Sequence, residues 1–438
     1  MMKKTIAITA AINMAVGSSV SLAAYSIPGY YGQVTLPKVG AATLPDVRDA
    51  VGATVSDPLI GQLIVKQNQP NAIINWKSFN IGANAVVYFQ QKNASGVPQP
   101  TWTALNRIYD SNPSQIFGQI KADGKVYLIN QNGILFGPGS QVNVHTLIAS
   151  TLDLKVANQD FLNGNGLFQF KAQNYQKLPK AIYDINKLSA TVSNHGIIAT
   201  DSGGSVYLLA STVENNGNIN APFGQVYLLA AQPASVSTAY DVDVTSLTPY
   251  QAGVSGGKVF NYQDGALSSD SGQVKLYGSA IDQEGTIRAG SAVNQNGLIE
   301  LHASGLIFTG RSSLIYSPIS GSSETMVADP SHPYTGGIIA FGGLGTITGT
   351  TANTTAAFID LGGKVVAPFG NVKLNAVNRV YLDSGASIDV SGLWVDKAAG
   401  SNLIDVQMNS INLRDDYGQK TGALKGETVA VNPLCGSK

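Results

Sequence analysis

The chain has little charge, one cysteine and almost no helical periodicity. Asp, Glu, Lys and Arg make up 12% of its 438 residues, about half of the usual globular share. The 27 acidic and 27 basic side chains balance, and no basic stripe is visible, which argues against nucleic-acid binding. Because Cys435, near the C-terminal end, is the only cysteine, no internal disulfide can hold the fold. A large core and backbone hydrogen bonds must stabilise it instead.

Residues 1–23 are typical of a secretory signal peptide. Two lysines are followed by a short apolar segment and by small residues before the predicted cleavage after Ala23, with Ala24 as the alternative. An N-terminal strand or core helix is the competing interpretation. No second long apolar run follows, so we expect an exported protein that does not span a membrane.

A strand-like phrase recurs along the chain, and each copy begins with glycine and is rich in Val, Ile, Leu and Tyr. The copies are GSVYLLA at Gly204, GQVYLLA at Gly224, GQVKLYG at Gly272, GLIELHA at Gly297 and GNVKLNA at Gly370. Their intervals of 20, 48, 25 and 73 residues fit one, two, one and three turns of a unit with insertions. That unit would be roughly 20–25 residues long, as in solenoid repeats.

A second phrase joins a polar residue and glycine to an alternating strand, at Asn194, Asn215, Gln283 and Asp383. Two strand phrases per repeat predict a solenoid, in which stacked coils share one core. Gly suits the corners because it accepts positive φ, and Asn because it bonds nearby backbone. We therefore predict an all-β parallel β-helix. A propeller would need a longer, more even period, and a sandwich would show no repeated phrase.

The ends and interruptions of the repeat predict the domain organisation. Open strand edges invite aggregation, so we expect a cap before the first coil. The stretch from Gly336 to Gly363 breaks the rhythm and is interpreted as a hairpin or loop packed on the rod. The predicted parts are a signal peptide (1–23), an N-terminal cap (24–60), a β-helix domain (61–310), further coils with a hairpin or loop insertion (311–400) and a tail (401–438).

The phrase YLINQNGILFG, residues 127–137, places a polar corner inside an apolar run. Its two ends read as strands, Asn130 and Asn132 can bond the corner's own backbone, and Gly133 can take positive φ.

The corner NQNGI (Asn130, Gln131, Asn132, Gly133, Ile134) resembles the Asn-Pro-Asn-Gly-Ile motif of two-partner secretion exoproteins, the filamentous haemagglutinin family, with Gln131 in the proline position. Segments 74–91, 104–137 and 142–154 are similar to that family's secretion domain in order and spacing. The family's second motif, Asn-Pro-Asn-Leu, is not intact. Its nearest counterpart is ALNRI, at 104–108.

The resemblance implies a right-handed parallel β-helix with an N-terminal β cap and extra-helical hairpins. It also implies export through the periplasm of a Gram-negative bacterium to a partner outer-membrane β-barrel transporter with periplasmic docking domains. The exoprotein then folds outside, secreted or bound to the cell surface, commonly as an adhesin or haemagglutinin that contacts host or cell-surface glycan or protein. The five corner residues become candidates for transporter recognition, against the simpler interpretation that they only shape the corner. No catalytic residue, metal or cofactor is implied.

The alternatives are a β-helical enzyme acting on extracellular polysaccharide, a lyase or glycosidase, and a purely structural surface rod. Asp241 and Asp243 alternate and form a candidate carboxylate pair, although a solvated strand face explains them more simply. The four histidines (His145, His195, His302, His332) lack metal-ligand spacing. Tyr207, Tyr227 and Tyr277 recur within the strand phrase and are expected to stack inward in the core rather than to bind glycan outside. From Ser391 onward the chain resembles the start of a longer exoprotein, and we expect a truncated continuation.

Overall fold

The computed structural model describes part of the chain: residues 39–165, 169–171, 190–231, 241–243, 257–291, 296–319, 336–342, 356–392, 404–407, 417, 421–422 and 425–431. The predicted signal peptide and Cys435 lie outside these residues. The chain divides into two compact units, one of residues 1–320 and 335–391 and one of residues 321–334 and 392–438. No helix among the described residues is long and apolar enough to cross a membrane.

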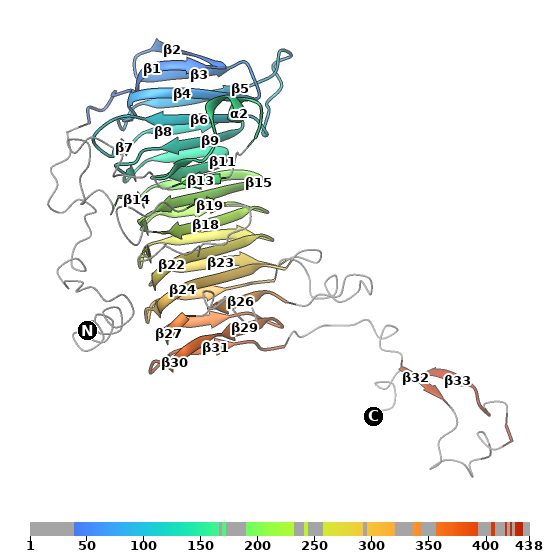
Figure 1. The fold of residues 1–438 in the computed structure, drawn as a ribbon. Helices are drawn as coiled ribbons and strands as arrows, with labels where there is room; N and C mark the ends of the chain where they lie inside the picture. Colours follow the sequence, from blue (N-terminus) through green and yellow to red (C-terminus); the bar gives the residue numbers. More distant parts are fainter. Residues whose placement is uncertain are drawn as a thin grey trace. The chain divides into compact units, whose positions relative to one another are not determined.

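The described strands of the first unit form coils that stack on one another in a parallel β-helix (Figure 1). Each full coil passes through three columns of parallel strands, here named A, B and C. Column A contains β3 (Gln62–Gln67), β5 (Val86–Gln91), β8 (Gln119–Ala122), the starts of β11 (Gln141–Ser150) and β15 (Ile197–Ala210), β17 (Asn218–Asn220), β21 (Ala266–Asp270), β23 (Thr286–Gly290), β25 (Leu314–Tyr316), β28 (Lys364–Val366) and β31 (Ser387–Asp389).

Columns B and C complete each coil. Column B contains β4 (Asn71–Ser78), β6 (Thr103–Ile108), β9 (Lys125–Ile129), the ends of β11 and β15, β18 (Gln225–Ala230), the starts of β22 (Gln273–Gln283) and β24 (Leu298–Thr309), β26 (Ile338–Phe341) and β29 (Asn371–Leu374). Column C contains β7 (Ser114–Ile116), β10 (Ile134–Phe136), β14 (Thr191–Asn194), β16 (Thr212–Asn215), β20 (Lys258–Asn261), the ends of β22 and β24, β27 (Ala356–Leu361) and β30 (Ala376–Leu382).

Two antiparallel strands lie on the N-terminal coil. β1 (Asp46–Val51) pairs with β4 and β2 (Ala53–Leu59) pairs with β3, so both strands run opposite to the coil beneath them. Their outer residues include charged side chains and Pro58. Charge and proline on an edge discourage pairing with another chain.

Alternation along each strand separates the inside of the coils from the outside. In β15, for example, Val206 and Leu208 belong to the interior cluster, whereas Tyr207 and Leu209 point outward. The interior is built mainly of Val, Ile, Leu and Ala, with a few large aromatic side chains, most of them near the N-terminal end. Branched aliphatic side chains fit a pleated, buried surface, which explains why the sequence uses them here.

The repeat count predicted from glycine spacing is wrong at two intervals. Strand β18 pairs directly with β22, so the 48 residues between Gly224 and Gly272 make one coil with an excursion, not two coils. Strand β24 pairs with β26, which pairs with β29, so Gly297 and Gly370 are two coils apart, not three. Insertions leave and rejoin the rod without adding a coil, so sequence distance overestimates coil number.

The stretch from Gly336 to Gly363 begins and ends in coil strands, because β26 and β27 run parallel to β24 in columns B and C. The hairpin or loop expected between them stays a prediction. Residues 343–355 lie outside the described part of the chain. In the second unit, β32 (Ile404–Gln407) and β33 (Thr428–Val431) form an antiparallel pair.

Glycine marks the corner between columns A and B, where the backbones of successive coils lie close together. A Cβ at Gly224 would overlap the carbonyl oxygen of Gly204, and one at Gly272 would overlap that of Gly224. The residue before the glycine is left-handed in several coils, with φ of 57° at Phe223 and 52° at Ser271. The repeated glycine of the strand phrase is therefore required by contact with the adjacent coil.

A ladder of buried amides runs along the corner between columns C and A. Asn194 Nδ2 donates to Asn215 Oδ1 at 2.8 Å, Asn215 Nδ2 to Asn261 Oδ1 at 2.8 Å, and Asn261 Nδ2 to Gln283 Oε1 at 2.9 Å. All four side chains are fully buried. Each amide also bonds the backbone of its own corner, as Asn215 does to the Gly217 carbonyl at 3.2 Å. The amides thereby satisfy polar groups that water cannot reach.

We expect Asn215→Ala to lower the free energy of unfolding by about 2–4 kcal/mol, because it leaves amide groups of Asn194 and Asn261 unpaired in the interior. Asn216→Ala is the matched control, since that neighbour lies outside the ladder. Urea unfolding of the mature chain measures both. Equal effects of the two substitutions would show that the ladder adds no stability.

Candidate functional site

The polar corner of residues 130–133 is a tight turn between β9 and β10. Gly133 N–H donates to the Asn130 carbonyl at 3.0 Å, which closes a four-residue β-turn. The side-chain oxygen of Asn130 accepts from Asn132 N–H at 2.9 Å, and Gly133 has φ of 117°. Asn favours the first turn position because its oxygen can bond the backbone two residues on. Gln131 occupies the second position, where proline is favoured.

The same corner holds the preceding coil. Asn130 Nδ2 donates to the Asn112 carbonyl at 3.1 Å and to Ser114 Oγ at 3.0 Å. Asn132 Nδ2 donates to the Asp110 carbonyl at 2.6 Å. Both asparagines therefore fix the loop that leads into β7, one coil earlier.

Burial divides the five candidate recognition residues. Asn130, Gly133 and Ile134 are buried, whereas Gln131 and Asn132 are half-buried. In the folded domain, a partner could reach little of this corner beyond Gln131 and part of Asn132. The geometry accounts for the motif as a structural element that joins two coils.

The ALNRI phrase supplies a second polar junction, to which sequence reasoning assigned no role. Asn106 is fully buried; its Oδ1 accepts from Trp76 Nε1 at 3.0 Å, and its Nδ2 donates to the Ala104 and Tyr127 carbonyls at 3.1 Å each. Arg107 points the other way, and its Nε lies 2.9 Å from Asp153 Oδ1. Neighbouring residues thus serve the inside and the outside of the coil.

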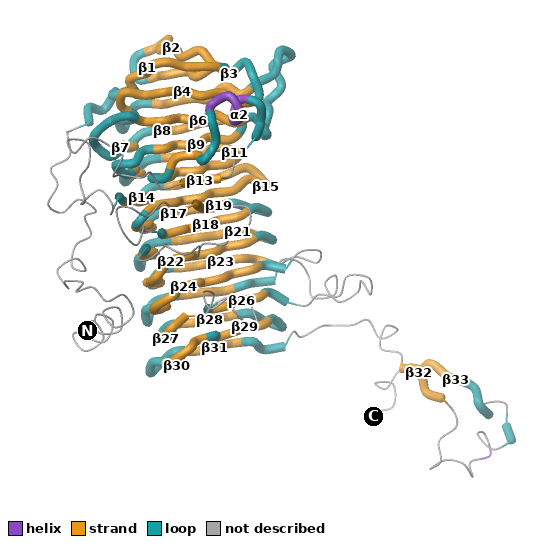
Figure 2. Tube along the Cα trace, in the orientation of Figure 1, coloured by secondary structure: helices purple, strands orange, loops and turns teal. Residues whose placement is uncertain are grey.

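Arg107 anchors a layer that lies outside the coils. This layer contains β12 (Asp153–Leu154), the short helix α2 (Asn158–Leu162), β13 (Gln169–Lys171) and β19 (Asp241–Asp243), and its three strands pair antiparallel. Arg107 Nη1 donates to Asn158 Oδ1 at 2.6 Å, beside the ion pair with Asp153. Figure 2 shows α2 beside column B near the N-terminal coils. A helix of five residues is too short to show a helical pattern in the sequence.

Apolar contacts complete the attachment of the layer. Phe161 of α2 and Phe170 of β13 are fully buried in the outer cluster that contains Tyr127. The rings of Tyr127 and Phe170 are 6.4 Å apart. Burial raises the pKa of Tyr127 well above its usual range, so this phenol stays neutral. The layer therefore covers an apolar strip on the outer face of column B.

The prediction that three recurring tyrosines stack inward is wrong in its direction. Tyr207, Tyr227 and Tyr277 are buried, but they belong to the outer cluster, while their neighbours fill the interior. Tyr207 and Tyr227 are in register, with rings 5.1 Å apart, whereas Tyr277 aligns with Leu229. The tyrosine of the third copy therefore lies two positions further along its strand than the tyrosines of the first two copies.

A charged cluster continues this outer face. Lys275 Nζ lies 2.8 Å from Glu300 Oε2, and the His302 ring stacks on Tyr277 at 4.5 Å. Burial opposes ionisation of Glu300, but hydrogen bonds from His302 and Lys275 and their charges outweigh it and lower its pKa. The carboxylate is therefore held ionised, as an ion-pair partner and not as a general acid.

A second titratable cluster lies on the outer face of column C. Ser193 Oγ is 3.0 Å from His195 Nε2, and Tyr262 donates to Glu214 Oε1 at 3.4 Å. Burial raises the pKa of Glu214 to about 7, against hydrogen bonds from Ser193 and Tyr262 that lower it, and burial lowers the pKa of His195. Ser193 is fully buried, so it cannot act as a nucleophile despite its histidine neighbour.

Other chemical candidates are not brought together. Asp241 and Asp243 lie in β19, paired by backbone with β13, and their side chains lie outside the described part of the chain. His145, His195 and His302 come from separate strands and corners, and His332 is not described. Among the described residues, no group of three or more His, Cys, Asp or Glu side chains could hold a metal ion.

We expect Asn130→Ala to lower the free energy of unfolding by about 2–4 kcal/mol, since it removes three side-chain hydrogen bonds at a buried corner. Gln131→Pro should raise it by about 0.5–1 kcal/mol, because proline restricts the unfolded chain and suits the second turn position. Thermal and urea unfolding measure both. A destabilising Gln131→Pro would contradict the turn assignment.

The raised pKa of Glu214 predicts a pH dependence of stability. Its folded-state pKa of about 7 exceeds its ordinary value of 4.5, so the folded chain holds the proton more tightly than the unfolded chain. This contribution is complete below pH 4.5 and is lost as pH rises through 7, by up to about 3 kcal/mol. Glu214→Gln should remove that step from unfolding curves between pH 4 and 8, and Asp57→Asn should not. An unchanged step in Glu214→Gln would assign it to another group.

Comparison with known proteins identifies relatives for this architecture. The model of the TPS secretion domain matches residues 43–314. A heme/hemopexin-binding protein of Haemophilus influenzae strain Rd is 35% identical over 192 residues, 43% of this chain and 19% of the relative. A second heme/hemopexin-binding protein of Haemophilus influenzae is 40% identical over 102 residues, 23% of this chain and 10% of the relative. The chain thus spans less than a fifth of the length of these relatives.

A solved structure shares the fold. The crystal structure of the HMW1 secretion domain from Haemophilus influenzae aligns with a TM-score of 0.50 and 20% identity, over 80% of this chain and 99% of that one. The alignment supports the parallel β-helix, and the family match covers more than half of the chain. The chain belongs to the TPS secretion domain family, the secretion domains of two-partner secretion exoproteins.

Proposed function

We propose that residues 43–314 direct export of the chain through a partner outer-membrane β-barrel transporter with periplasmic docking domains. The observation that carries this proposal is the match of these residues to the TPS secretion domain, whose strands here form one capped stack of coils. The product is a secreted exoprotein, released or held at the cell surface of a Gram-negative bacterium after passage through the periplasm.

The contacts between coils favour folding in one direction, from the N-terminal coil onward. Asn130 and Asn132 bond the backbone of the preceding coil, and each amide of the C–A ladder bonds the amide of the next coil. A coil can therefore be completed on the one before it, as in other repeat proteins. A chain that leaves in extended form would fold outside from its antiparallel N-terminal strands, and each completed coil would oppose backward movement.

The corner residues Asn130, Gln131, Asn132, Gly133 and Ile134 remain our candidates for the secretion motif. Burial of Asn130, Gly133 and Ile134 supports a role through folding, because a docked partner could not touch them in the finished domain. In this proposal the transporter reads a domain whose shape the corner helps to form.

The surface role that fits best is that of an adhesin-like rod. Parallel coils place long rows of side chains on three faces, and we propose that such rows contact host or cell-surface glycans or proteins. The named relatives bind heme or hemopexin. Since this chain covers only a small share of their length, we do not assign heme binding to it.

Secretion tests this proposal directly. The chain is expressed with and without a candidate transporter, and the mature protein is measured in the culture medium. Transporter-dependent release is expected, reduced at least fivefold by Asn130→Ala and Gly133→Ala and unchanged by Gln131→Ala. A protein that stays in the periplasm in every case would overturn the export proposal. An equal loss of release in Gln131→Ala would instead indicate that the transporter contacts the exposed part of the corner directly.

A further inference from the structure

The corners between columns C and A differ in length, and this difference shapes the surface. Corners of four residues, such as 137–140 and 262–265, project outward, and their tips Pro138 and Asp264 are exposed. Corners of two residues stay close to the rod. Two short corners, 195–196 and 216–217, follow each other directly between those two long ones.

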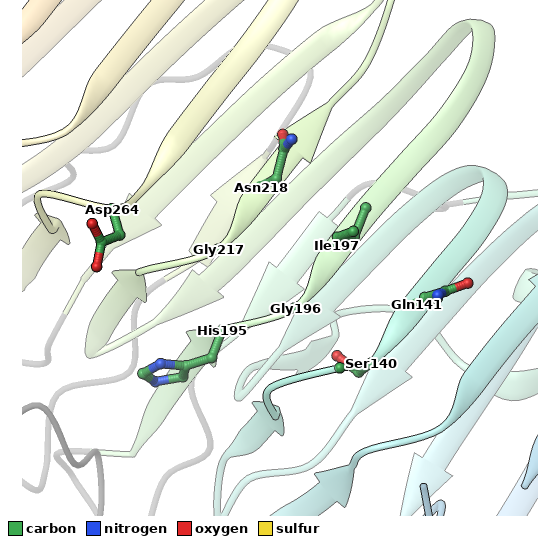
Figure 3. Close-up of a pocket in the computed structure, with 9 residues that line it drawn as sticks. Ser140, Gln141, His195, Gly196, Ile197, Gly217, Asn218 and Asp264 are labelled. Atoms are coloured by element: carbon green, nitrogen blue, oxygen red, sulfur yellow. The ribbon is translucent and has the colours of Figure 1, made fainter. Parts of the chain in front are cut away.

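A groove results at this place. Its walls are three strand spacings apart, about 14 Å between backbones. Its volume is about 330 Å³, and its lining comes from four successive coils. Gly196 and Gly217 of the two short corners line it between these walls, and a Cβ at either glycine would overlap the preceding coil. Figure 3 shows that Ser140, His195, Asn218 and Asp264, which line the groove, come from different corners and strands.

The lining is polar and carries little charge. It contains the carboxylate of Asp264, the amides of Gln141 and Asn218, the imidazole of His195, and the apolar side chain of Ile197, which is 50% exposed. None of the described residues that line the groove is a lysine or arginine. An anionic ligand such as a phosphate or a carboxylate would therefore meet a negative charge without a cation to balance it.

Ser140 gives an independent sign of a ligand. Its side chain is 1% exposed, and its Oγ has no hydrogen-bond partner. A buried hydroxyl without a partner costs about 1–3 kcal/mol, and such groups in native proteins call for an explanation. Because Ser140 lines the groove, a ligand hydroxyl at its base can supply the missing partner.

Of an extended peptide, a lipid and a neutral sugar, the neutral sugar fits this groove best. An extended peptide would need a free strand edge, but β15 and β17 are each paired on both sides here. A lipid would need apolar walls, and Ile197 alone provides an exposed large aliphatic group among the lining residues. We propose that this groove binds a neutral pyranose ring of a glycan, with Asp264 accepting from ring hydroxyls, Asn218 bonding a neighbouring hydroxyl, Ser140 closing the base and Ile197 packing on the apolar ring edge.

This proposal does not depend on the export route and can be tested on purified mature chain. Methyl glycosides of glucose, galactose, mannose and N-acetylglucosamine, and their disaccharides, are titrated by saturation-transfer NMR and calorimetry. Sialic acid and glucuronic acid serve as anionic counterparts. We expect saturable binding of at least one neutral saccharide and no comparable binding of the anionic ones.

Variants locate the binding. Asp264→Asn should weaken it at least tenfold, Asn218→Trp should abolish it by filling the groove, and Asp57→Asn on β2 should leave it unchanged. Ser140→Ala should weaken it severalfold without lowering the melting temperature, because its hydroxyl makes no bond within the protein. Absence of neutral-saccharide binding, equal binding of the anionic sugars, or binding that survives both Asp264→Asn and Asn218→Trp overturns the proposal.

Discussion

The stacking of one coil on the next at a single strand spacing is the constraint from which the rest of this structure follows. Backbone ladders in columns A, B and C fix that spacing at about 4.8 Å. Each corner must then fit within the same height, because a corner that spread further would pull its strands apart. Glycine at the A–B corner and the buried amide ladder at the C–A corner are two solutions to this one problem. The first removes side-chain volume, and the second satisfies the backbone groups that closeness buries.

The same constraint connects the proposed secretion motif to the fold. Asn130 and Asn132 are corner residues in the ordinary sense, yet their amides reach the backbone of the previous coil. A change at this corner therefore disturbs two coils near the N-terminal end, from which the stack would grow. In a chain without internal disulfides, no covalent link would compensate. In the function proposed above, a short motif acts on export through folding and needs no large exposed surface for the partner.

Sequence reasoning found what depends on local chemistry. Repeated glycines, the Asn-Gly corners and the alternating strands predict a parallel β-helix because each follows from backbone geometry within a few residues. It missed what depends on distance and phase. Arg107 meets Asp153 across 46 residues, and no spacing rule connects an arginine in a strand to an aspartate beyond the next coils. The tyrosines are predicted to point inward because aromatic ladders stabilise solenoids, but alternation alone cannot say which face of a strand looks inward.

Strands and corners have different roles in this molecule: strands build the core, and the length of a corner sets the height of the local surface. Strand residues are committed to the core on one side and to neighbouring coils along both edges, so they can change little without cost. Corners accept either two or four residues between the same strands, as residues 195–196 and 262–265 do in nearby coils. A difference of two residues leaves the register intact while it raises or lowers the local surface. Grooves on such a rod can therefore arise and vary through corner length alone, and the groove beside His195 is placed by the same stacking that keeps the core unchanged.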